Sequence, residues 1–412
     1  MAHTILVTGS TGSVGSNVCR LAARPGRRVR ALVRPGTEPA PLIQCGAEPV
    51  IGDVTDPYSV DLAMDGVDGV VHCAAQIGGM WSTARPEDYE AVNHQGSVNV
   101  LDAAERAGVR RIVMLLSAIL FDPSQTVTED SRVVPAGPAD SPYVRTKRAA
   151  YDEGMARVSR GTEIAFVVPA GIYGPSLFLE RALVPTIFTG TLMKTATGEL
   201  TRYLPMPISW VLAEDVADIA LRALDRGRSG ARYLAMGRAE DARSIPAFCN
   251  TFLELAGIHR RVAEVHPGGA AGDDPEFGPM TRMIRENYPT PPHDCARTTA
   301  ELGRPPTPLT EGLGHRVPPA PGREHRPVPL LGLDPGARGP VVAGQLAVER
   351  PGRDHVRGAP VRAVLLRQRL HDPRPRPRSC RRPPGSPSRW RSPARDSGRR
   401  RPRRRLPPRA PR

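Results

Sequence analysis

The sequence predicts an α/β protein built on a doubly wound parallel sheet. Short runs rich in Val, Ile and Leu alternate with helix-forming stretches through the first half of the chain. These runs show no polar–apolar alternation, as expected for strands that are covered by helices on both faces. A glycine-rich turn joins the first such run directly to the first helical stretch.

The expected elements follow one another along the chain. Six strands are predicted at His3–Thr8, Arg28–Val33, Glu48–Ile51, Gly69–Cys73, Arg111–Leu116 and Glu163–Val168. Helical patterns separate them at Val14–Ala23, Tyr58–Met64, Tyr89–Ala107 and Tyr143–Val158. A seventh strand is predicted at Arg232–Met236. We therefore expect a sheet domain at 1–170 and a smaller region at 171–313, some of whose segments return to the sheet.

Composition changes abruptly after Leu313. The net charge of the 412-residue chain is +15, but residues 314–412 hold 26 Arg and no Lys against 6 acidic residues. Residues 1–313 therefore carry 31 basic and 36 acidic side chains. The Arg/Pro-rich tail has too few apolar residues to build a core. Three interpretations stay open: a disordered low-complexity tail, a frame-shifted translation, or a nucleic-acid-binding segment, which the scarcity of aromatic residues disfavours.

Several other features exclude classes of protein. The six cysteines form no CxxC pair, and neither they nor the ten histidines show metal-ligand spacing. We therefore expect reduced thiols, no metal and a cytoplasmic location. No apolar run reaches the roughly 18 residues needed to cross a bilayer. The strand-like residues Thr4–Val7 also give the N-terminus no signal-peptide layout, so no membrane partner is expected.

The glycine-rich turn indicates a dinucleotide site. Glycines let the backbone turn tightly and approach a pyrophosphate, while the N-terminus of the following helix offers N–H groups to the anion. The residues expected to contact the cofactor here are Gly9, Thr11, Gly12, Ser13, Val14 and Gly15. The GxxGxxG spacing of this turn resembles that of the short-chain dehydrogenase/reductase superfamily, which implies a Rossmann fold.

The end of the second strand indicates which cofactor binds. Arg34 follows this strand, where NAD-binding domains usually carry Asp or Glu, and a guanidinium can pair with the 2′-phosphate of NADP. We therefore expect NADP, with NAD as the alternative. The sequence resembles dihydroflavonol-4-reductase-like enzymes, which carry a phosphate-binding arginine at the place of Arg34. The same resemblance implies further cofactor contacts from Asp53, Val54, Ala74, Ala75, Pro169 and Ile172. Arg34 could instead be a solvated surface arginine, and Asp53 an ordinary turn aspartate.

Tyr143 and Lys147 form a YxxxK motif on a predicted helix, where positions i and i+4 share a face. An ammonium beside the phenol is expected to lower the pKa of Tyr143 toward the working pH, which suits a general acid or base. Lys147 is one of only two lysines in the chain, so its place in the motif favours a chemical role. A surface Tyr/Lys pair is the alternative.

Ser117 ends the fifth strand and completes the pattern. Together these motifs resemble the extended short-chain dehydrogenases/reductases, the NAD-dependent epimerase/dehydratase family, over residues 1 to about 313. The resemblance implies that Ser117, Tyr143 and Lys147 are catalytic, that Tyr143 and Lys147 also contact the cofactor, and that the protein forms a homodimer through 89–107 and 143–158. The segment Val168–Pro175 resembles the family's RPxxVYGP motif, but Val168 stands where the family usually has Arg.

These residues predict an NADP-dependent oxidoreductase that reduces a ketone or aldehyde, or oxidises the alcohol. Residues 1–170 would then bind NADP and residues 171–313 the substrate. A small apolar or aromatic substrate is favoured by the residues expected around it, which are Ile77, Met80, Trp81, Phe121 and Tyr173. The alternatives are a nucleotide-sugar epimerase or dehydratase with bound NAD, and a non-catalytic NADP-sensing regulator.

Overall fold

The computed structural model describes residues 3–78, 82–122, 124–137, 140–183, 188–265 and 293–314. The chain divides into two compact units, Met1–Ala343 and Gly344–Arg412, and all described residues belong to the first. Residues 315–412, which hold almost all of the Arg/Pro-rich tail, lie outside the described residues.

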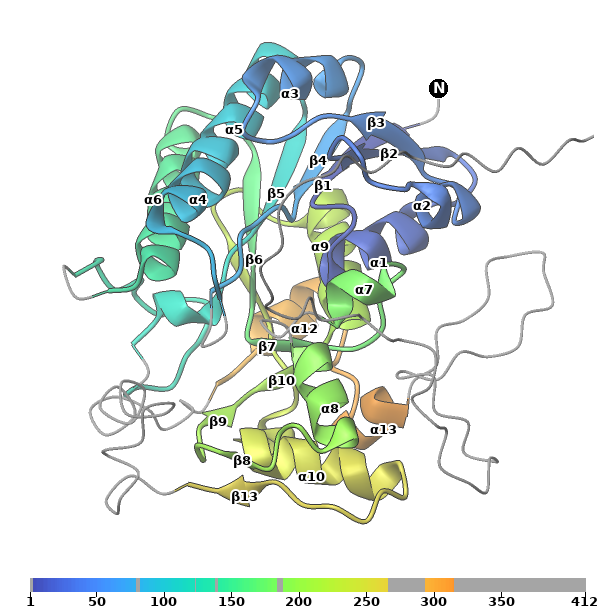
Figure 1. Cartoon of the computed structure of the whole chain (residues 1–412). Coiled ribbons are helices and arrows are strands. Elements are labelled where there is room, and N and C mark those ends of the chain that lie inside the picture. The colour runs from blue at the N-terminus through green and yellow to red at the C-terminus, as the bar shows by residue number, and fades with distance from the viewer. Residues whose placement is uncertain are drawn as a thin grey trace, which may run out of the picture. The chain divides into compact units, whose positions relative to one another are not determined.

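Seven strands form one parallel central sheet (Figure 1). Their order is β11-β6-β5-β4-β1-β2-β3, so the chain winds outward from β1 in both directions. The strands are β1 (His3–Thr8), β2 (Arg27–Val33), β3 (Glu48–Ile51), β4 (Gly69–His72), β5 (Arg111–Leu115), β6 (Ile164–Pro169) and β11 (Arg232–Ala235). All seven predicted strands and the doubly wound Rossmann-type fold are confirmed. Because the strands are parallel, all their carboxyl ends lie along one edge of the sheet.

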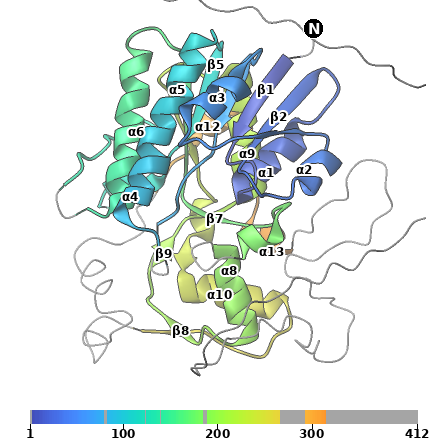
Figure 2. The same cartoon turned by 45° about the horizontal axis from the view of Figure 1, so that its top comes forward.

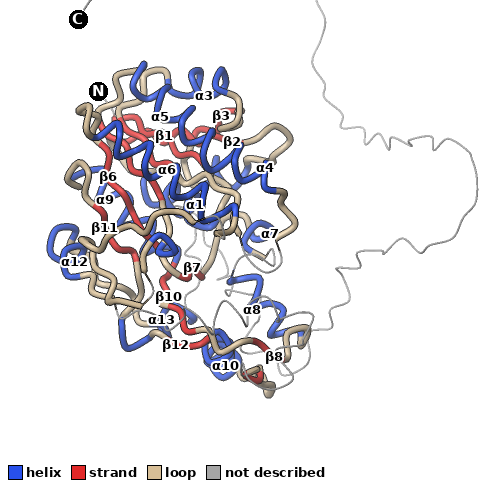
Figure 3. Tube along the Cα trace, turned by 90° about the vertical axis from the view of Figure 1, so that its left-hand side faces the viewer, coloured by secondary structure: helices blue, strands red, loops and turns tan. Residues whose placement is uncertain are grey.

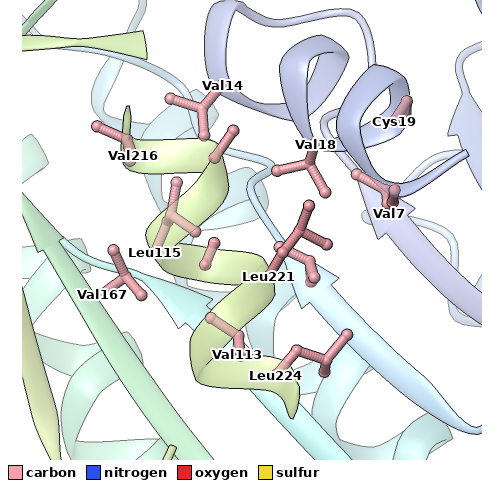
Figure 4. Close-up of a cluster of buried hydrophobic side chains, with 14 of the residues drawn as sticks. Val7, Val14, Val18, Cys19, Val113, Leu115, Val167, Val216, Leu221 and Leu224 are labelled. Carbon is pink, nitrogen blue, oxygen red and sulfur yellow. The ribbon is translucent and has the colours of Figure 1, made fainter. Parts of the chain in front are cut away.

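Helices cover both faces of this sheet, as Figure 2 shows. Helices α1 (Ser13–Ala22) and α9 (Ala213–Arg226) cover one face, and α3 (Pro57–Met64), α5 (Gly96–Arg106) and α6 (Pro142–Val158) cover the other. Alternate residues of each strand point to opposite faces: Val113 and Leu115 pack beneath α9, whereas Ile112 and Met114 pack beneath α5 and α6. Figure 4 shows the first of these two cores, in which α1 and α9 bury their Val, Leu and Cys side chains against the strands.

Helix α9 was not predicted, although its sequence carries the signal. Its buried apolar residues recur at helical spacing: Val216, Ala217, Ile219, Ala220, Leu221, Ala223 and Leu224. The helix completes the cover of the sheet between α1 and β6.

The helix predicted at Tyr89–Ala107 contains an irregular turn. A short helix, α4 (Pro86–Tyr89), leads into a π-helical turn, η1 (Glu90–Gln95), which continues into α5. A π turn adds a residue to the helix and re-aims the side chains around it, and such turns are frequent at functional sites. Here the turn carries Asn93, which is 1% exposed.

The remaining elements build a third core around β7 (Gly171–Tyr173) and β10 (Trp210–Leu212), which pair in parallel. Figure 3 shows α8, α10 and α13 gathered around these strands, apart from the central sheet. The Trp210 indole stacks on the Phe248 ring, with centroids 3.7 Å apart. The other elements are α2 (Ala40–Gln44), η2 (Ala118–Leu120), α7 (Leu179–Ala182), α8 (Phe188–Thr197), β8 (Arg202–Tyr203), β9 (Pro207–Ile208), η3 (Ala239–Asp241), β12 (Arg243–Ser244), α10 (Ile245–Leu255), β13 (Ala263–Glu264), α12 (Ala296–Leu302) and α13 (Leu309–Gly314). None of the described helices is long and apolar enough to span a bilayer.

Asp215, in the first turn of α9, ties the last described segment to the rest of the fold. Its carboxylate is fully buried and accepts hydrogen bonds from the Thr307 backbone N–H at 2.7 Å and the Thr307 hydroxyl at 2.9 Å. It also pairs with Arg304. Gly303 ends α12 in the left-handed conformation, with φ of 63°, and turns the chain toward these contacts.

We expect Asp215→Ala to lower the free energy of unfolding by about 3 kcal/mol, because it leaves the half-buried Arg304 and Thr307 donors without their fully buried acceptor. Asp218→Ala is the matched control. Asp218 lies one turn further along α9, pairs with Arg222 and Arg304, and is partly exposed, so its loss should cost less than about 1 kcal/mol. Urea denaturation measures both changes, and equal losses would contradict this role for Asp215.

Candidate active site

The glycine turn lies at the carboxyl edge of the sheet, directly against the end of β4. A Cβ added to Gly9 would lie 2.6 Å from the Ala74 backbone nitrogen, and one added to Gly15 would lie 2.2 Å from the Gly9 carbonyl oxygen. Gly9 also has a φ of +64°, which favours glycine. The Ser10 hydroxyl donates to the Leu32 carbonyl at 2.6 Å and fixes the turn to the end of β2. These three contacts hold the turn in a single tight shape.

This turn is suited to an anion. No side chain caps the N-terminus of α1, so its first-turn N–H groups have no side-chain partner among the described residues. The Ser13 hydroxyl is buried and likewise has no hydrogen-bond partner there. An orphaned hydroxyl and open helix amides beside a backbone with no room for side chains fit the pyrophosphate of a dinucleotide. Thr11 and Gly12 are half-buried, and Val14 is buried beneath α9.

Arg34 and Asp53 lie further along the same edge, after β2 and β3. Arg34 is exposed, and it forms no ion pair with another described residue. The Asp53 carboxylate accepts from the Thr55 N–H and hydroxyl, both at 2.9 Å, which is a local Asx turn. Val54 is buried, and its carbonyl accepts from the Asn99 side chain at 2.8 Å. Asp53 therefore has a structural role in its own turn, whatever else it contacts.

The other residues expected to contact the cofactor follow β4 and β6. Ala74 and Ala75 are half-buried, and the Ala74 N–H donates to the Thr8 hydroxyl at 3.3 Å. Pro169 is buried at the end of β6, opposite Ala235 of β11. Ile172 is half-buried in β7 and packs against the core beneath α9.

Ser117 and Tyr143 come together at the carboxyl end of β5. Ser117 precedes η2, and Tyr143 lies in the first turn of α6. The Ser141 hydroxyl accepts from the Val144 N–H at 3.3 Å and caps this helix. An interaction with the Ser117 side chain opposes the rise in the pKa of the Tyr143 phenol, so the two hydroxyl groups lie near each other. The Tyr143 ring packs edge-on against Tyr89, with centroids 6.3 Å apart. Gly78 lies against the same ring, because a Cβ there would be 2.9 Å from it.

Lys147 lies one turn further along α6 and is 6% exposed. Its ammonium donates to the Leu115 carbonyl at 2.9 Å, at the end of β5. Burial lowers the pKa of Lys147 to about 8. Burial raises the pKa of the neighbouring Cys73 to about 12, against the opposing effect of the Lys147 charge. The lysine therefore sits between the ends of β4 and β5, one helical turn from Tyr143.

The expected lowering of the Tyr143 pKa is wrong for this structure. Burial of the phenol raises its pKa, the interaction with the Ser117 side chain opposes that rise, and the nearby Tyr89 adds to it. The Lys147 ammonium is directed to the Leu115 carbonyl. Tyr143 is therefore held in its protonated form at neutral pH.

A buried hydrogen-bond chain links the glycine turn to α6, and sequence reasoning missed it. The Thr8 hydroxyl lies 2.7 Å from His72 Nδ1, and His72 Nε2 lies 2.9 Å from the Ser97 hydroxyl. Ser97 donates to the Asn93 carbonyl at 2.6 Å, so it accepts from His72 Nε2–H, and His72 Nδ1 accepts from Thr8. The only sequence signal was a set of polar side chains at positions where the strand and helix should be buried.

Asn93 carries this chain onward. Its side-chain amide accepts from the Gln76 N–H at 2.7 Å and donates to the Gln76 carbonyl at 3.0 Å and to the Thr146 hydroxyl at 3.3 Å. Thr146 in turn donates to the Pro142 carbonyl at 2.8 Å, in the first turn of α6. The π-helical turn places Asn93 where it can hold the strand-end segment and the Tyr143 helix together.

The residues expected around the substrate are only partly where they were predicted. Ile77 is half-buried and precedes Gly78, which lies against the Tyr143 ring. Phe121 is 5% exposed and packs under Arg232, and Tyr173 is 1% exposed with its ring against Phe248, so neither lies open to a substrate. Those two predictions are wrong because η2 and β7 turn these rings into the cores. Met80 and Trp81 lie outside the described residues.

No group of three or more His, Cys, Asp or Glu side chains in the described part of the chain is placed to hold a metal ion. The candidate site instead combines a glycine turn for a dinucleotide with a hydroxyl, a phenol and an ammonium at the end of β5. This combination, on a doubly wound parallel sheet, defines a nicotinamide-dinucleotide enzyme of the extended short-chain dehydrogenase/reductase type.

Comparison with known protein families supports this class of enzyme. The model of the NAD dependent epimerase/dehydratase family matches residues 5–235, and the chain belongs to this family. Enzymes of the family include NAD(P)-dependent oxidoreductases, epimerases and dehydratases. The predicted resemblance to extended short-chain dehydrogenases/reductases is thereby confirmed.

Individual relatives differ in activity. Sterol demethylase protein B of Methylococcus capsulatus is 32% identical over 236 residues, which cover 57% of this chain and 70% of that protein. A putative dihydroflavonol 4-reductase of Synechocystis is 27% identical over 338 residues, which cover 77% of this chain and 94% of the relative. Further relatives carry the names 3-beta-hydroxysteroid dehydrogenase and UDP-glucose 4-epimerase.

Solved structures share the fold. The Bordetella bronchiseptica enzyme WbmH, solved in complex with NAD+, superposes with a TM-score of 0.57 at 20% identity. The match covers 76% of this chain and 95% of WbmH.

We expect His72 to make the protein less stable in acid. Burial lowers the pKa of His72 to about 3, with a smaller effect from Lys147, whereas an unfolded histidine titrates near 6.5. Between about pH 6 and pH 4 the unfolded state binds a proton that the folded state does not. The free energy of unfolding therefore decreases by about 1.4 kcal/mol for each unit by which the pH falls in this range.

His72→Gln should remove this contribution and flatten the pH dependence measured by urea denaturation. Thr8→Val is the control, because it removes one hydrogen bond but leaves the buried imidazole in place. An unchanged slope in His72→Gln would show that His72 gains no proton on unfolding.

Proposed function

We propose that this protein is an NADP-dependent oxidoreductase that reduces the carbonyl group of a small apolar or aromatic ketone or aldehyde, or oxidises the corresponding alcohol. One observation carries the proposal: Ser117 and the protonated Tyr143 lie near each other at the carboxyl end of β5, with Lys147 one helical turn away. Bound NADP would supply or accept the hydride.

The chain's own residues have distinct parts in this proposal. Tyr143 donates its phenolic proton to the substrate oxygen, and its raised pKa keeps that proton in place at neutral pH. The Ser117 hydroxyl donates a hydrogen bond to the same oxygen and stabilises the charge that develops there. Lys147 carries a buried positive charge at the end of β5, where it holds the nicotinamide ribose.

The substrate class follows from the surroundings of Ser117 and Tyr143. Two apolar residues are close to the pair in sequence: Ile77 precedes Gly78, which lies against the Tyr143 ring, and Ile119, which is 37% exposed, is two residues after Ser117. The names of two relatives, a sterol demethylase protein and a dihydroflavonol 4-reductase, also refer to apolar or aromatic ring compounds. These features favour such a carbonyl compound over a nucleotide sugar.

Arg34 supports NADP over NAD. It is exposed at the carboxyl end of β2, the strand next to β1 and its glycine turn, and no acidic residue occupies that place. A carboxylate there would repel a 2′-phosphate, whereas a guanidinium attracts it. The remaining residues proposed to contact the dinucleotide are those of the glycine turn together with Asp53, Val54, Ala74, Ala75, Tyr143, Lys147, Pro169 and Ile172.

We expect Tyr143→Phe to lower kcat for carbonyl reduction at least 100-fold, because the proton donor is lost. NADPH affinity should stay within about twofold, since the ring is kept. Tyr151→Phe is the matched control: it lies two turns along the same helix and its hydroxyl contacts Arg232 instead. Turnover of a panel of ketones and aldehydes, followed at the nicotinamide absorbance, measures the effect.

The same assay separates the alternative functions. Normal turnover in Tyr143→Phe would overturn the assignment of Tyr143. Oxidised NAD that copurifies with the protein, together with no carbonyl reduction, would favour an epimerase or dehydratase. NADPH binding with no turnover of any kind would favour a regulator.

We expect Arg34→Ser to weaken NADPH binding about 10- to 100-fold and to leave NADH binding unchanged, because only NADP carries the 2′-phosphate. Arg28→Ser is the control, since Arg28 lies near the start of the same strand and pairs with Glu48. Calorimetric titration with both cofactors measures the ratio. Equal losses for NADPH and NADH would show that Arg34 does not read the phosphate.

A further inference from the structure

We propose that Arg148 is a positioning residue that fixes the Ser117 segment against α6 and acts on the reaction through Ser117. The inference rests on the proposed function, because it concerns the same site. It assigns a role to a residue that the YxxxK motif does not include.

Side chains of helix α6 contact the Ser117 segment, residues 115–120, on both sides of Ser117. Lys147 donates to the Leu115 carbonyl at 2.9 Å, and Arg148 Nη2 donates to the Leu120 carbonyl at 3.1 Å. These carbonyls lie two residues before and three residues after Ser117. Tyr143, on the same helix, lies near Ser117 itself. Three side chains of one rigid helix therefore contact a stretch of six residues.

The segment has little internal support for holding a hydroxyl in place. Ser117 is followed by η2, a single 3-10 turn, and such turns have poor hydrogen-bond geometry. The bond from the Ile119 N–H to the Ser117 hydroxyl is 3.4 Å long, and that from the Leu120 N–H to the Ser117 carbonyl is 3.2 Å. On the near side of Ser117 the Leu116 N–H donates to the Val167 carbonyl at 2.8 Å, and on the far side the Leu120 carbonyl also accepts from the Val134 N–H at 2.9 Å.

Burying the charged Arg148 side chain at this position costs free energy, because the guanidinium loses its hydration. It is 6% exposed, and its Nε has no hydrogen-bond partner in the described part of the chain. Burial lowers its pKa, and the charges that oppose this effect are Asp152, Asp140 and Tyr151. Arg157, on the same helix, is equally buried but pairs with Asp102 and Glu153.

An apolar side chain would fill the position of Arg148 without this desolvation cost. The guanidinium gains one contact that an apolar side chain cannot make, which is the hydrogen bond to the Leu120 carbonyl. That contact acts on the segment that carries Ser117.

A double-mutant cycle between Arg148 and Ser117 tests the inference. We expect Arg148→Met to lower kcat at least tenfold, because Ser117 is no longer held at the substrate oxygen. NADPH affinity should stay within about twofold. In a Ser117→Ala background the same change should alter kcat less than about twofold, because the hydroxyl that Arg148 positions is already absent. An equal loss in both backgrounds would mean that Arg148 only stabilises the fold.

Two further variants sharpen the comparison. Arg145→Met is the matched control, since Arg145 lies on α6 and donates to the Asp140 carbonyl, but is exposed and does not touch the Ser117 segment. It should keep kcat within about twofold. Arg148→Lys keeps a cationic donor and should recover part of the lost rate. It also replaces Arg148→Met in the cycle if that variant does not fold.

The ionisation of Tyr143 gives a readout that needs no turnover. Ultraviolet titration of the phenolate, taken as the difference between each protein and its Tyr143→Phe counterpart, measures this pKa. The groups that face Tyr143 are Ser117, Tyr89 from α4, and Lys147 one turn along α6. If Arg148→Met moves Ser117 away from the phenol, the pKa of Tyr143 should rise further, and only while Ser117 is present.

The two readouts separate the possible failures. A Ser117-dependent rise in the Tyr143 pKa without turnover of any carbonyl compound would reject the proposed function and keep the role of Arg148. Turnover in the wild type, with no dependence of the Arg148→Met effect on Ser117 in either readout, would reject the role of Arg148 alone.

Discussion

The close approach of two backbone segments at the carboxyl edge of the sheet is the constraint on which the site depends. The glycine turn lies so near the end of β4 that Gly9 has no space for a Cβ, and within the turn the Gly9 carbonyl leaves none at Gly15. This contact brings the N-terminus of α1, with its open N–H groups, beside the segment that leads to Gly78 and Tyr143. Any side chain at either glycine would push the cofactor cradle away from the proposed catalytic residues.

A second requirement is that buried polar groups at this edge find partners. Thr8, His72, Ser97, Asn93 and Thr146 satisfy one another in a continuous chain that runs from β1 to α6. Because each member has a defined donor and acceptor, the chain fixes the His72 tautomer and the relative placement of strand and helix. The π-helical turn in the middle is what allows Asn93 to reach both sides. The cost of burying these groups is therefore offset by a rigid base for the site.

The sequence predicted the sheet well because the strands are uninterrupted apolar runs and the glycine turn marks their order. It also placed Ser117, Tyr143 and Lys147 at one strand end. It could not predict which way Phe121 and Tyr173 face, because the tight turns after β5 and β6 decide that, and neither turn has a periodic signal. The predicted lowering of the Tyr143 pKa was wrong for a related reason. The i, i+4 spacing indicates that Lys147 shares a helix face with Tyr143, but only the fold shows that the Lys147 ammonium is directed to the Leu115 carbonyl.

The direction of the Tyr143 pKa shift bears on the direction of the reaction. A phenol with a raised pKa gives up its proton less readily to water, but it remains protonated across the neutral range and is available to a substrate oxygen that becomes basic as hydride arrives. Alcohol oxidation requires the opposite, a phenolate that accepts a proton, and burial disfavours that charge. Lys147, with its pKa lowered to about 8, still carries most of its charge at neutral pH, but its ammonium is directed to the Leu115 carbonyl. Under the proposed function, the protonated Tyr143 therefore suits proton donation to a carbonyl oxygen at neutral pH, whereas its use as a base needs a phenolate that burial disfavours.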